Sequence, residues 1–411
     1  MKNSCRFCGQ LLEVSFCDLG LSPLSNSFLT KDQLSEPEKV FPLHAKVCSN
    51  CFLVQVPMFE RPESIFTEYA YFSSYSKSWV EHARKYTENM IARFHFGPQH
   101  FVVEVASNDG YLLKFFKERD IPILGIEPAE NVALVAQSSA GIPTIVKFFG
   151  RSLAEELATT ARKADLLIGN NVLAHVPDIN DFVSGLKFLL SPTGVITMEF
   201  PHLLQLMKGN QFDTIYHEHF SYLSFLAAQR VFDKHGLRLF DVEEMATHGG
   251  SLRIYGCHKN DNTKPNTAAV TALLQKEKDF GLDKLEVYNA FETRVKELKR
   301  KLVSFLTGLK KEGKTIVGYG APAKGNTLLN YCEIGPDLIP FTVDVSPYKQ
   351  GKYLPGVHIP VLHPDEIKKK RPDYVLILPW NIKEEVIQQH SYIGSWGGKF
   401  VLPIPEVAIL P

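Results

Sequence analysis

The sequence predicts an α/β protein built around a doubly wound parallel sheet, and two observations support this fold class. Short apolar segments alternate with helical patterns, as in βαβ units. In addition, FVVEVASNDGYLLK at 101–114 combines a β-branched run, a tight polar turn and the start of an amphipathic helix, which is typical of the first βα unit of such a sheet. The candidate strands are 101–106, 122–126, 143–146, 165–169 and 194–200, and 232–255 is expected to form a closing hairpin or edge pair.

The chain of 411 residues is long enough for two or three domains, and its pattern changes along its length. The first segment contains cysteines, is interrupted by prolines and has little helical periodicity. Apolar residues recur at steps of three and four over 266–311, which predicts one long connector helix. A second, smaller open α/β sheet is expected from Thr315 onwards. The predicted domains are a metal-binding module at 1–70, a central domain at 71–260, and a connector with a Rossmann-like domain at 261–411.

Composition excludes several classes of function. Lys plus Arg and Asp plus Glu both number 45, and this zero net charge argues against a nucleic-acid partner. No apolar run is long enough to span a membrane, and the N-terminus MKNSCRFCGQ lacks the apolar region of a signal peptide. We therefore expect a cytoplasmic protein whose seven cysteines are not a disulfide framework.

Four of the cysteines form two CxxC pairs, Cys5/Cys8 and Cys48/Cys51. Two such pairs can place four thiolates around one tetrahedral ion, so we predict a structural zinc site with an inserted loop. The alternative is a redox dithiol or unrelated free thiols. The remaining cysteines, Cys17, Cys257 and Cys332, are expected to be ordinary buried thiols.

The turn after the first strand predicts a nucleotide site of unusual charge. It has only one glycine, Gly110, so it is not a GxGxxG pyrophosphate cradle, and the acids Glu104 and Asp109 would repel phosphates. A cationic nucleoside without phosphate suits these acids, which indicates S-adenosylmethionine. Glu127 ends the second strand, where ribose hydroxyls are held in such folds. The predicted cofactor-binding residues are Glu104, Ser107, Asn108, Asp109, Glu127, Asn170 and Asn171, and the alternative is that they are turn-forming residues without a ligand.

The segment FDTIYHEHFSYLS concentrates ionisable groups at Tyr216, His217, Glu218 and His219. Such density is costly in a core and typical of a catalytic cleft, and histidine is the usual general base near neutral pH. If the segment is extended, His217 and His219 share one face. A HExxH metal motif is excluded because position 221 is Ser221. Further candidates are His175 and the aromatic run at 69–75, and the alternative for a lone histidine is a satisfied core residue.

The turn GYGAPAKGN at 318–326 opens a helix and contains Lys324 and Asn326. Glycines allow close backbone approach, and a helix N-terminus attracts phosphate. Its spacing is not GxGxxG, so a nucleoside diphosphate carried by the substrate fits better than nicotinamide. Lys349 lies in a later turn-rich loop and is a further substrate-binding candidate, whose alternative is solvated surface charge. Asp344 ends the next strand and could simply cap it.

Eight segments, together with the cysteine pairs, resemble the nucleotide-sugar 3-C-methyltransferase family. They are EVASNDGYLL, GIEPAENVA, NNVLAHVPD, FDTIYHEHFSYLS, HGGSLR, GYGAPAKGNTLLN, FTVDVSPYKQGKYLPG and DYVLILPWN. The resemblance implies a zinc module, a central methyl-donor domain and a Rossmann-like domain, with the nucleotide-sugar between the last two. One departure is Ala106, where a glycine is frequent.

The resemblance also implies roles for particular residues. The implied catalytic residues are His219, Glu218, Tyr216, His175 and Tyr71, with Tyr69 and Tyr75 as alternatives to Tyr71. The implied substrate-binding residues are Tyr75, His217, Lys324, Asn326 and Lys349.

The expected substrate is a nucleoside-diphospho-4-keto-6-deoxyhexose, methylated at C3 through deprotonation and an enolate. An O- or N-methyltransferase of a non-sugar substrate and a non-catalytic zinc-ribbon scaffold are the rival hypotheses, and a dehydrogenase is the least supported. The nucleotide base, the hexose isomer, the stereochemistry and the oligomeric state stay open, with a monomer as the working expectation.

Overall fold

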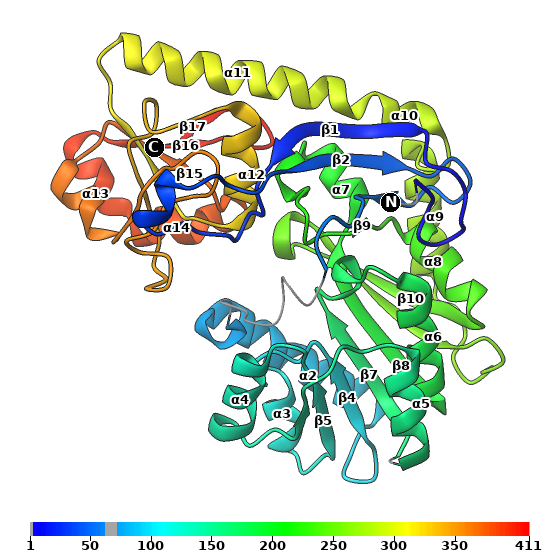
Figure 1. The fold of residues 1–411 in the computed structure, drawn as a ribbon. Coiled ribbons are helices and arrows are strands. Elements are labelled where there is room, and N and C mark those ends of the chain that lie inside the picture. The colour runs from blue at the N-terminus through cyan, green and yellow to red at the C-terminus, as the bar shows by residue number, and fades with distance from the viewer. Residues whose placement is uncertain (1–2, 62–71, 161, 411) are drawn as a thin grey trace.

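A computed structural model describes residues 3–61, 72–160 and 162–410 of the chain. It contains three β-sheets: a small antiparallel one near the N-terminus, a seven-stranded central one and a six-stranded one near the C-terminus. In Figure 1 the central sheet lies below the other two, and the helix α11 (Phe291–Lys311) runs along the top of the molecule. No helix in these described ranges is both long and apolar enough to cross a membrane.

The central sheet confirms the predicted fold class. Its strand order is β10-β11-β8-β7-β4-β5-β6, parallel from β8 to β6 and antiparallel at β11 and β10. The chain proceeds from β4 outwards to β6 and then returns to β7 on the other side of β4, so a topological switch point lies between β4 and β7. The strands are β4 (Val102–Val105), β5 (Ile123–Ile126), β6 (Thr144–Ile145), β7 (Ala164–Asn170), β8 (Leu190–Pro201), β10 (Leu237–Met245) and β11 (Ser251–His258).

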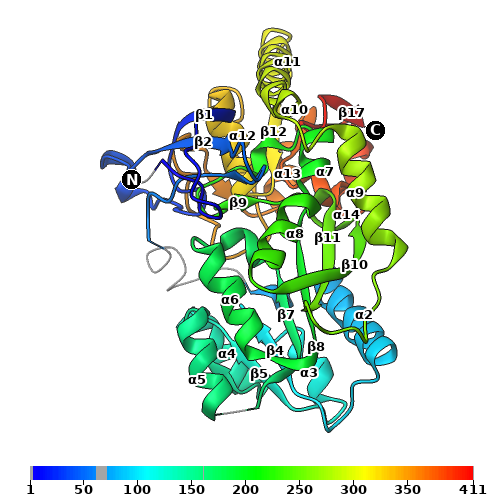
Figure 2. The ribbon, with the colours of Figure 1, turned by 90° about the vertical axis from the view of Figure 1, so that its right-hand side faces the viewer.

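Helices cover both faces of this sheet, which explains why its strands are apolar throughout. The side chain of Val102 packs in a core with α2 and α3, whereas Val103 packs in a core with α5, α6 and α8. Figure 2 shows α5 and α6 on one side of the sheet and α2 on the other. The helices are α2 (Lys77–Phe94), α3 (Leu113–Lys117), α4 (Glu130–Ser139), α5 (Arg151–Thr160), α6 (Ile179–Leu189) and α8 (Phe225–Lys234). The short helix α7 (Leu203–Lys208) packs instead in the core that includes the N-terminal and C-terminal sheets.

The N-terminal sheet is completed by a strand from the central part of the chain. Its order is β1 (Val14–Ser22), β2 (Phe41–Val47), β3 (Val54–Gln55) and β9 (Ser221–Tyr222), all antiparallel. Since β9 directly follows the Tyr216–His219 segment, this sheet supports the predicted catalytic region. The boundaries predicted at residues 70 and 260 stay predictions.

The prediction of one long connector helix is wrong. The structure has three helices instead, α9 (Ala268–Phe280), α10 (Leu285–Asn289) and α11. Gly281, at φ +96°, ends α9, and its N–H donates to the carbonyls of Glu277 and Lys278. The break lets α10 and α11 follow β1, where the rings of Phe16 and Phe291 stack at 4.7 Å.

The C-terminal sheet repeats the switch-point arrangement. Its order is β14-β13-β12-β15-β16-β17, with only β17 antiparallel, so the switch point lies between β12 and β15. The helix α12 follows β12, and the short helix η6 (Trp380–Ile382) follows β15. The elements are β12 (Ile316–Tyr319), α12 (Ala323–Cys332), β13 (Thr342–Val343), β14 (Val361–Leu362), α13 (Asp365–Lys370), β15 (Tyr374–Ile377), α14 (Lys383–Gln389), β16 (Lys399–Leu402) and β17 (Ala408–Leu410).

Candidate active site

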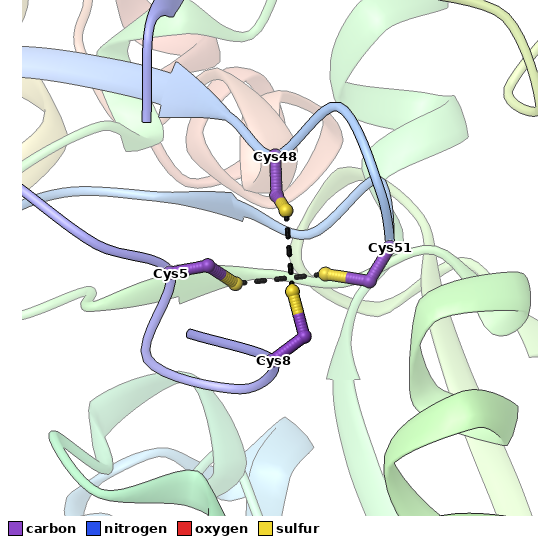
Figure 3. A group of neighbouring side chains, drawn as sticks. All are labelled: Cys5, Cys8, Cys48 and Cys51. Carbon is purple, nitrogen blue, oxygen red and sulfur yellow. Dashed lines mark hydrogen bonds between the residues drawn. The ribbon is translucent and has the colours of Figure 1, made fainter. Parts of the chain in front are cut away.

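The four predicted metal ligands converge. The sulfur atoms of Cys5, Cys8, Cys48 and Cys51 all lie within 4.8 Å of one another. Figure 3 shows the four side chains pointing toward one another. Two of the Sγ–Sγ distances, Cys5–Cys51 and Cys8–Cys48, are 3.5 Å. Four thiolates in this arrangement fit a tetrahedral zinc ion, and a closed shell of four protein ligands is typical of a structural site.

A neighbouring amide supports this cluster. The Gln55 side chain donates to the Cys5 sulfur at 3.2 Å and accepts from the Arg6 main-chain N–H at 2.9 Å. The contact with Cys51, followed by the donors around Cys5, lowers the pKa of the Cys5 thiol to about 4, which favours the thiolate that a metal requires. Gln55 is a residue of β3, so the cluster is tied to the sheet that also contains β9.

The turn after β4 has a constrained backbone. Ala106 and Asn108 adopt left-handed conformations at φ +57° and +50°, so Ala106 occupies a conformation that favours glycine. The Glu127 carboxylate accepts from the N–H groups of Asn108 (3.0 Å) and Ala129 (2.9 Å). Glu127 therefore stabilises the turn after β4 and the turn after β5, and it is also the residue expected to lie near a ribose.

The acids of this turn are buried and repel one another. Glu104 is 1% exposed, and among the described residues nothing donates a hydrogen bond to either of its carboxylate oxygens. Burial, then the charges of Asp109, Glu127 and Glu199, raise the pKa of Glu104 well above its ordinary value. One oxygen of Asp109 accepts from the Ser74 N–H at 3.0 Å, whereas Oδ1 is buried without a partner in the described chain. Acidic acceptors without donors suit a cationic nucleoside rich in hydroxyl and amino groups, so these residues fit S-adenosylmethionine.

The remaining predicted cofactor residues lie around the same switch point. Asn170 ends β7 and Ser107 lies in the turn after β4, both buried. Asn108 Oδ1 accepts from the Ser73 N–H at 2.9 Å, which docks the start of the segment before α2 onto the turn. Asn171, at φ +55°, donates from Nδ2 to His248 Nε2 at 3.1 Å. The predicted residues are therefore gathered at one edge of the sheet.

The segment with two histidines forms a turn, so the expectation that His217 and His219 share a face is wrong. The His219 N–H donates to the Tyr216 carbonyl at 2.9 Å, which brings these two side chains together. The Tyr216 hydroxyl lies 2.7 Å from His219 Nε2, and His219 Nδ1 lies 2.9 Å from the Thr214 carbonyl. Since a carbonyl only accepts, Nδ1 carries the proton and Nε2 accepts from the phenol. Burial, followed by the nearby His175, lowers the pKa of His219 well below its ordinary value, so the ring is neutral.

His175, from the short helix η3 (Leu173–His175), completes this cluster. Its ring lies 4.6 Å from that of His219, edge to face, and its Nδ1 donates to the Glu218 carbonyl at 2.9 Å. Burial lowers the pKa of His175 to about 4. In this tautomer Nε2 of His175 carries no proton, so it can accept a hydrogen bond there but cannot donate one.

The Glu218 side chain faces the N-terminal segment instead of an imidazole. It is 4% exposed, and Oε1 accepts from Asn26 Nδ2 at 2.7 Å. Burial raises the pKa of Glu218 to about 7, and the Asn26 donor opposes this shift.

Three predicted residues lie apart from the cluster or outside the described ranges. His217 packs edge to face against Phe41 and Phe59, and its Nε2 lies 3.3 Å from the Pro42 carbonyl, so it contacts the N-terminal module. Tyr75 is 67% exposed. Tyr71, like Tyr69, lies outside the described residues.

The predicted substrate residues of the C-terminal sheet lie at its switch point. Lys324 is half-buried, contacts the Trp380 ring at 4.3 Å and donates to Asn381 Oδ1. Asn326 is fully buried, and its Nδ2 has no partner within the described chain. Lys349 donates to the Ala321 carbonyl at 3.0 Å, so it contacts the β12–α12 turn and is not simply solvated surface charge.

Sequence reasoning missed several residues that the structure adds to the site. Asp213 is fully buried and accepts from the Trp380 indole N–H at 2.7 Å. His248 and Asn26 also reach the cluster or its neighbours. Asp213, His248 and Trp380 lie within the segments FDTIYHEHFSYLS, HGGSLR and DYVLILPWN, so the motifs contained the signal, whereas nothing in the local sequence distinguishes Asn26.

Family models match three consecutive parts of the chain. They are a putative zinc binding domain at residues 5–66, a methyltransferase domain at 79–242 and a C-methyltransferase C-terminal domain at 246–405. The chain is also 35% identical over 410 residues to C-methyltransferase NovU of Streptomyces niveus, covering 99% of this chain and 97% of that protein.

Solved structures with a similar fold include two of low identity. Magnesium protoporphyrin IX methyltransferase from Synechocystis PCC 6803 with bound SAM matches at 13% identity and TM-score 0.34, over 44% of this chain and 79% of that one. The PH0226 protein from Pyrococcus horikoshii matches at 14% identity and TM-score 0.38, over 49% and 100%.

The zinc and S-adenosylmethionine predicted from the sequence are thus the cofactors of this protein. The family resemblance of its motifs is confirmed over the full length of the chain. The chain belongs to the family of C-methyltransferases.

Proposed function

We propose that this C-methyltransferase methylates C3 of a nucleoside-diphospho-4-keto-6-deoxyhexose. The observation that supports this most directly is the half-buried Tyr216–His219 pair with its neutral imidazole, which lies near the switch points of two α/β sheets. A neutral imidazole in a water-poor site is suited to removing a weakly acidic proton next to a ketone. The second α/β sheet offers a place for the nucleotide part of such a substrate.

His219 is the proposed base. Its Nδ1 is held by the Thr214 carbonyl, so Nε2 is the nitrogen that takes the C3 proton. The electron pair of the broken C3–H bond forms a C3–C4 double bond, and negative charge moves to the C4 oxygen. The Tyr216 hydroxyl, 2.7 Å from Nε2, loses its acceptor when that nitrogen is protonated and can then donate to the C4 oxygen.

The neighbouring groups hold the reacting parts in place. His175 contacts the His219 ring and, in the tautomer that its contact with the Glu218 carbonyl requires, would serve as an acceptor toward a sugar hydroxyl. Glu218 makes no contact with an imidazole in the described chain through its carboxylate, which favours a role in binding a sugar hydroxyl. Tyr71 and Tyr75, from the segment before α2, and His217 stay proposals for binding the substrate.

The other groups bind the two reactants. Glu104, Asp109 and Glu127 would hold the methyl donor, together with Ser107, Asn108, Asn170 and Asn171. When bound, S-adenosylmethionine supplies an electrophilic methyl group, which bonds to C3 as the methyl–sulfur bond breaks and its electron pair stays on sulfur. Lys324, Asn326 and Lys349 would bind the nucleotide-sugar. The cytoplasm is the proposed location, because four thiolate ligands and three further free thiols require a reducing compartment.

The proposal is tested by exchange of the C3 proton for deuterium in the absence of a methyl donor. The wild-type protein should catalyse exchange with at least one keto-sugar nucleotide, and His219→Gln should slow it by about 10²–10⁴-fold. His235→Gln, which changes a partly buried histidine that contacts Asn180 of α6, is the matched control and should leave exchange unchanged. Unaltered exchange in His219→Gln would show that another group is the base, and methylation of a non-sugar acceptor without exchange would refute the substrate.

A further inference from the structure

Lys324 lies where the two α/β sheets of the molecule meet. It is the second residue of α12 and follows β12 at the switch point of the C-terminal sheet. The short helix η4 (Phe212–Thr214) packs against α12, and its Phe212 ring lies 5.2 Å from that of Tyr331. Lys324 is therefore part of a junction with the segment that leads into the catalytic turn.

The Lys324 ammonium group is held by a defined set of contacts. It lies 4.3 Å from the centre of the Trp380 ring and donates to Asn381 Oδ1. The Trp380 indole N–H in turn donates to Asp213 at 2.7 Å. The other oxygen of Asp213 is buried without a hydrogen-bond partner among the residues described. Lys324 and Asp213 are thus oppositely charged groups that contact the same indole ring, Lys324 over its face and Asp213 at its N–H.

A continuous chain of contacts connects this pair with the first switch point. Asn171, directly after β7, donates to His248 at 3.1 Å. The next residue, Gly249, packs on Trp380 so closely that a Cβ there would lie 2.5 Å from a ring carbon, at a backbone φ of +90°. The positive charge of Lys324 lowers the pKa values of His219 and His248, although burial is the larger cause for both. The ammonium group therefore lies within electrostatic reach of the proposed base.

The surroundings of Lys324 are poorly suited to a diphosphate. The buried Asp213 carboxylate would repel two adjacent negative charges, and Asp344 already accepts the Ala321 N–H at the same turn. A single negative charge that develops on one oxygen beside His219 is a better match, because a half-buried ammonium group interacts with it more strongly than an ammonium group in bulk water does. Burial lowers the pKa of Lys324 to about 8, and Asp213 opposes this shift, so the amine is still charged at neutral pH.

We propose that Lys324 is a catalytic residue whose ammonium group stabilises the negative charge on the C4 oxygen when the C3 proton leaves, and that Asp213, through Trp380, is its positioning residue. This inference rests on the proposed function. The C3–H electron pair becomes the C3–C4 double bond as the C4–O double bond opens, and the ammonium donates a hydrogen bond without giving up its proton. When C3 bonds to the methyl group, the C4–O double bond forms again.

The first test compares Lys324→Met with Lys324→Arg in the deuterium-exchange assay with saturating keto-sugar nucleotide. Loss of one oxyanion donor typically costs about 10²–10³-fold, so Lys324→Met should slow exchange by that amount, while Lys324→Arg keeps the charge and should recover part of it. Titration with dTDP, UDP and GDP should give the same affinity for the variant as for the wild type. Lys399→Met, which changes an exposed lysine of β16 in the same sheet, is the control that should leave exchange unchanged.

The second test uses Asp213→Asn and measures the pH dependence of exchange. The titratable groups around Lys324 are Asp213, His219 and His248. Without the Asp213 charge, the pKa of Lys324 falls below about 8, so the loss of rate at high pH should begin at lower pH. If Asp213 has only a structural role, the variant should have a lower rate, but the pH at which the rate begins to fall should stay the same.

The outcomes distinguish an error in the role of Lys324 from an error in the proposed function. If Lys324→Met exchanges as fast as the wild type but loses affinity for the nucleoside diphosphate, Lys324 binds phosphate and the inference is wrong while the proposed function stands. If exchange by Asp213→Asn begins to slow at the same high pH as exchange by the wild type, Asp213 does not position Lys324. If the wild-type protein exchanges no keto-sugar nucleotide, the proposed function fails, and the inference fails with it.

Discussion

The side-chain amide of Asn26 donates a hydrogen bond of 2.7 Å to the buried carboxylate of Glu218. These residues are 192 positions apart, and Asn26 belongs to the segment that leaves β1 of the N-terminal sheet. A second contact from this segment joins Ser25 to Thr327 of α12 at 3.3 Å. The segment after β1 therefore reaches both the catalytic turn and the C-terminal sheet, which makes the N-terminal module part of the site.

Asn26→Ala should alter the ionisation of Glu218. The amide lowers the Glu218 pKa against the larger effect of burial, so its loss should raise that pKa above about 7. If the ionised carboxylate binds the sugar, the acidic limb of the pH profile of kcat/KM should move to higher pH, and KM should rise more than kcat falls. The pH profiles of both proteins test this, with Asn50→Ala, an exposed residue of the same module, as control. An acidic limb in the same place would show that Asn26 does not tune Glu218.

Glu218 should also make the stability of the protein depend on pH. Its pKa is raised from an ordinary value of 4.5 to about 7, so the unfolded chain loses this proton at lower pH than the folded chain does. Between about pH 4.5 and 7 the folded state binds the extra proton, and stability attributable to this group falls as pH rises, by about 3 kcal/mol over the window.

Glu218→Gln removes this dependence and keeps an acceptor for Asn26. The melting temperature of the variant relative to the wild type should therefore increase from pH 5 to pH 8, as measured by thermal unfolding. Glu118→Gln, an exposed residue at the end of α3, should show no such trend. An equal difference at both pH values would mean that Glu218 is ionised with an ordinary pKa in the folded protein.

Local patterns in the sequence were sufficient to predict the central sheet. The five parallel strands and the acids after β4 and β5 follow from apolar runs that end in polar residues, and the carboxyl ends of parallel strands meet at one edge. The prediction of one connector helix is wrong because the helical pattern of the sequence does not reveal the break at Gly281. The backbone of Gly281 is in the left-handed region, which ends α9. Periodicity reports which face is buried and does not show where the chain breaks.

The catalytic turn shows a different limit. His219, and not His217, lies beside Tyr216 because the His219 N–H donates to the Tyr216 carbonyl and because β9 pairs with β3. That pairing joins residues far apart in the chain. The contact of Trp380 with Asp213 likewise exists only because two sheets dock, so a local motif could contain both residues without revealing that they meet.

Loss of zinc should impair catalysis through β9 and not through the chemistry itself. Cys48→Ser removes one of four thiolates next to the sheet that holds the catalytic turn, so it should abolish stoichiometric zinc, lower the melting temperature and reduce kcat. Cys17→Ala changes a buried cysteine of the same module that lies outside the cluster, and it should retain zinc. Zinc content by mass spectrometry, with kcat on the same samples, tests this. Full activity in a zinc-free protein would show that the module does not support the turn.

Glu104→Gln should change cofactor affinity and stability in opposite directions. The buried Glu104 carboxylate has no donor in the described chain and is repelled by Asp109 and Glu127, so its charge costs stability when no cofactor is bound. The neutral amide should therefore raise the melting temperature of the cofactor-free protein. It should also weaken binding of S-adenosylmethionine by about 10–100-fold, because a hydrogen bond to a charged group contributes about 1.5–3 kcal/mol. Calorimetric titration and thermal unfolding of the same variant measure the two effects, with Glu118→Gln as the control. If the variant is destabilised and still binds S-adenosylmethionine normally, the methyl donor lies away from Glu104.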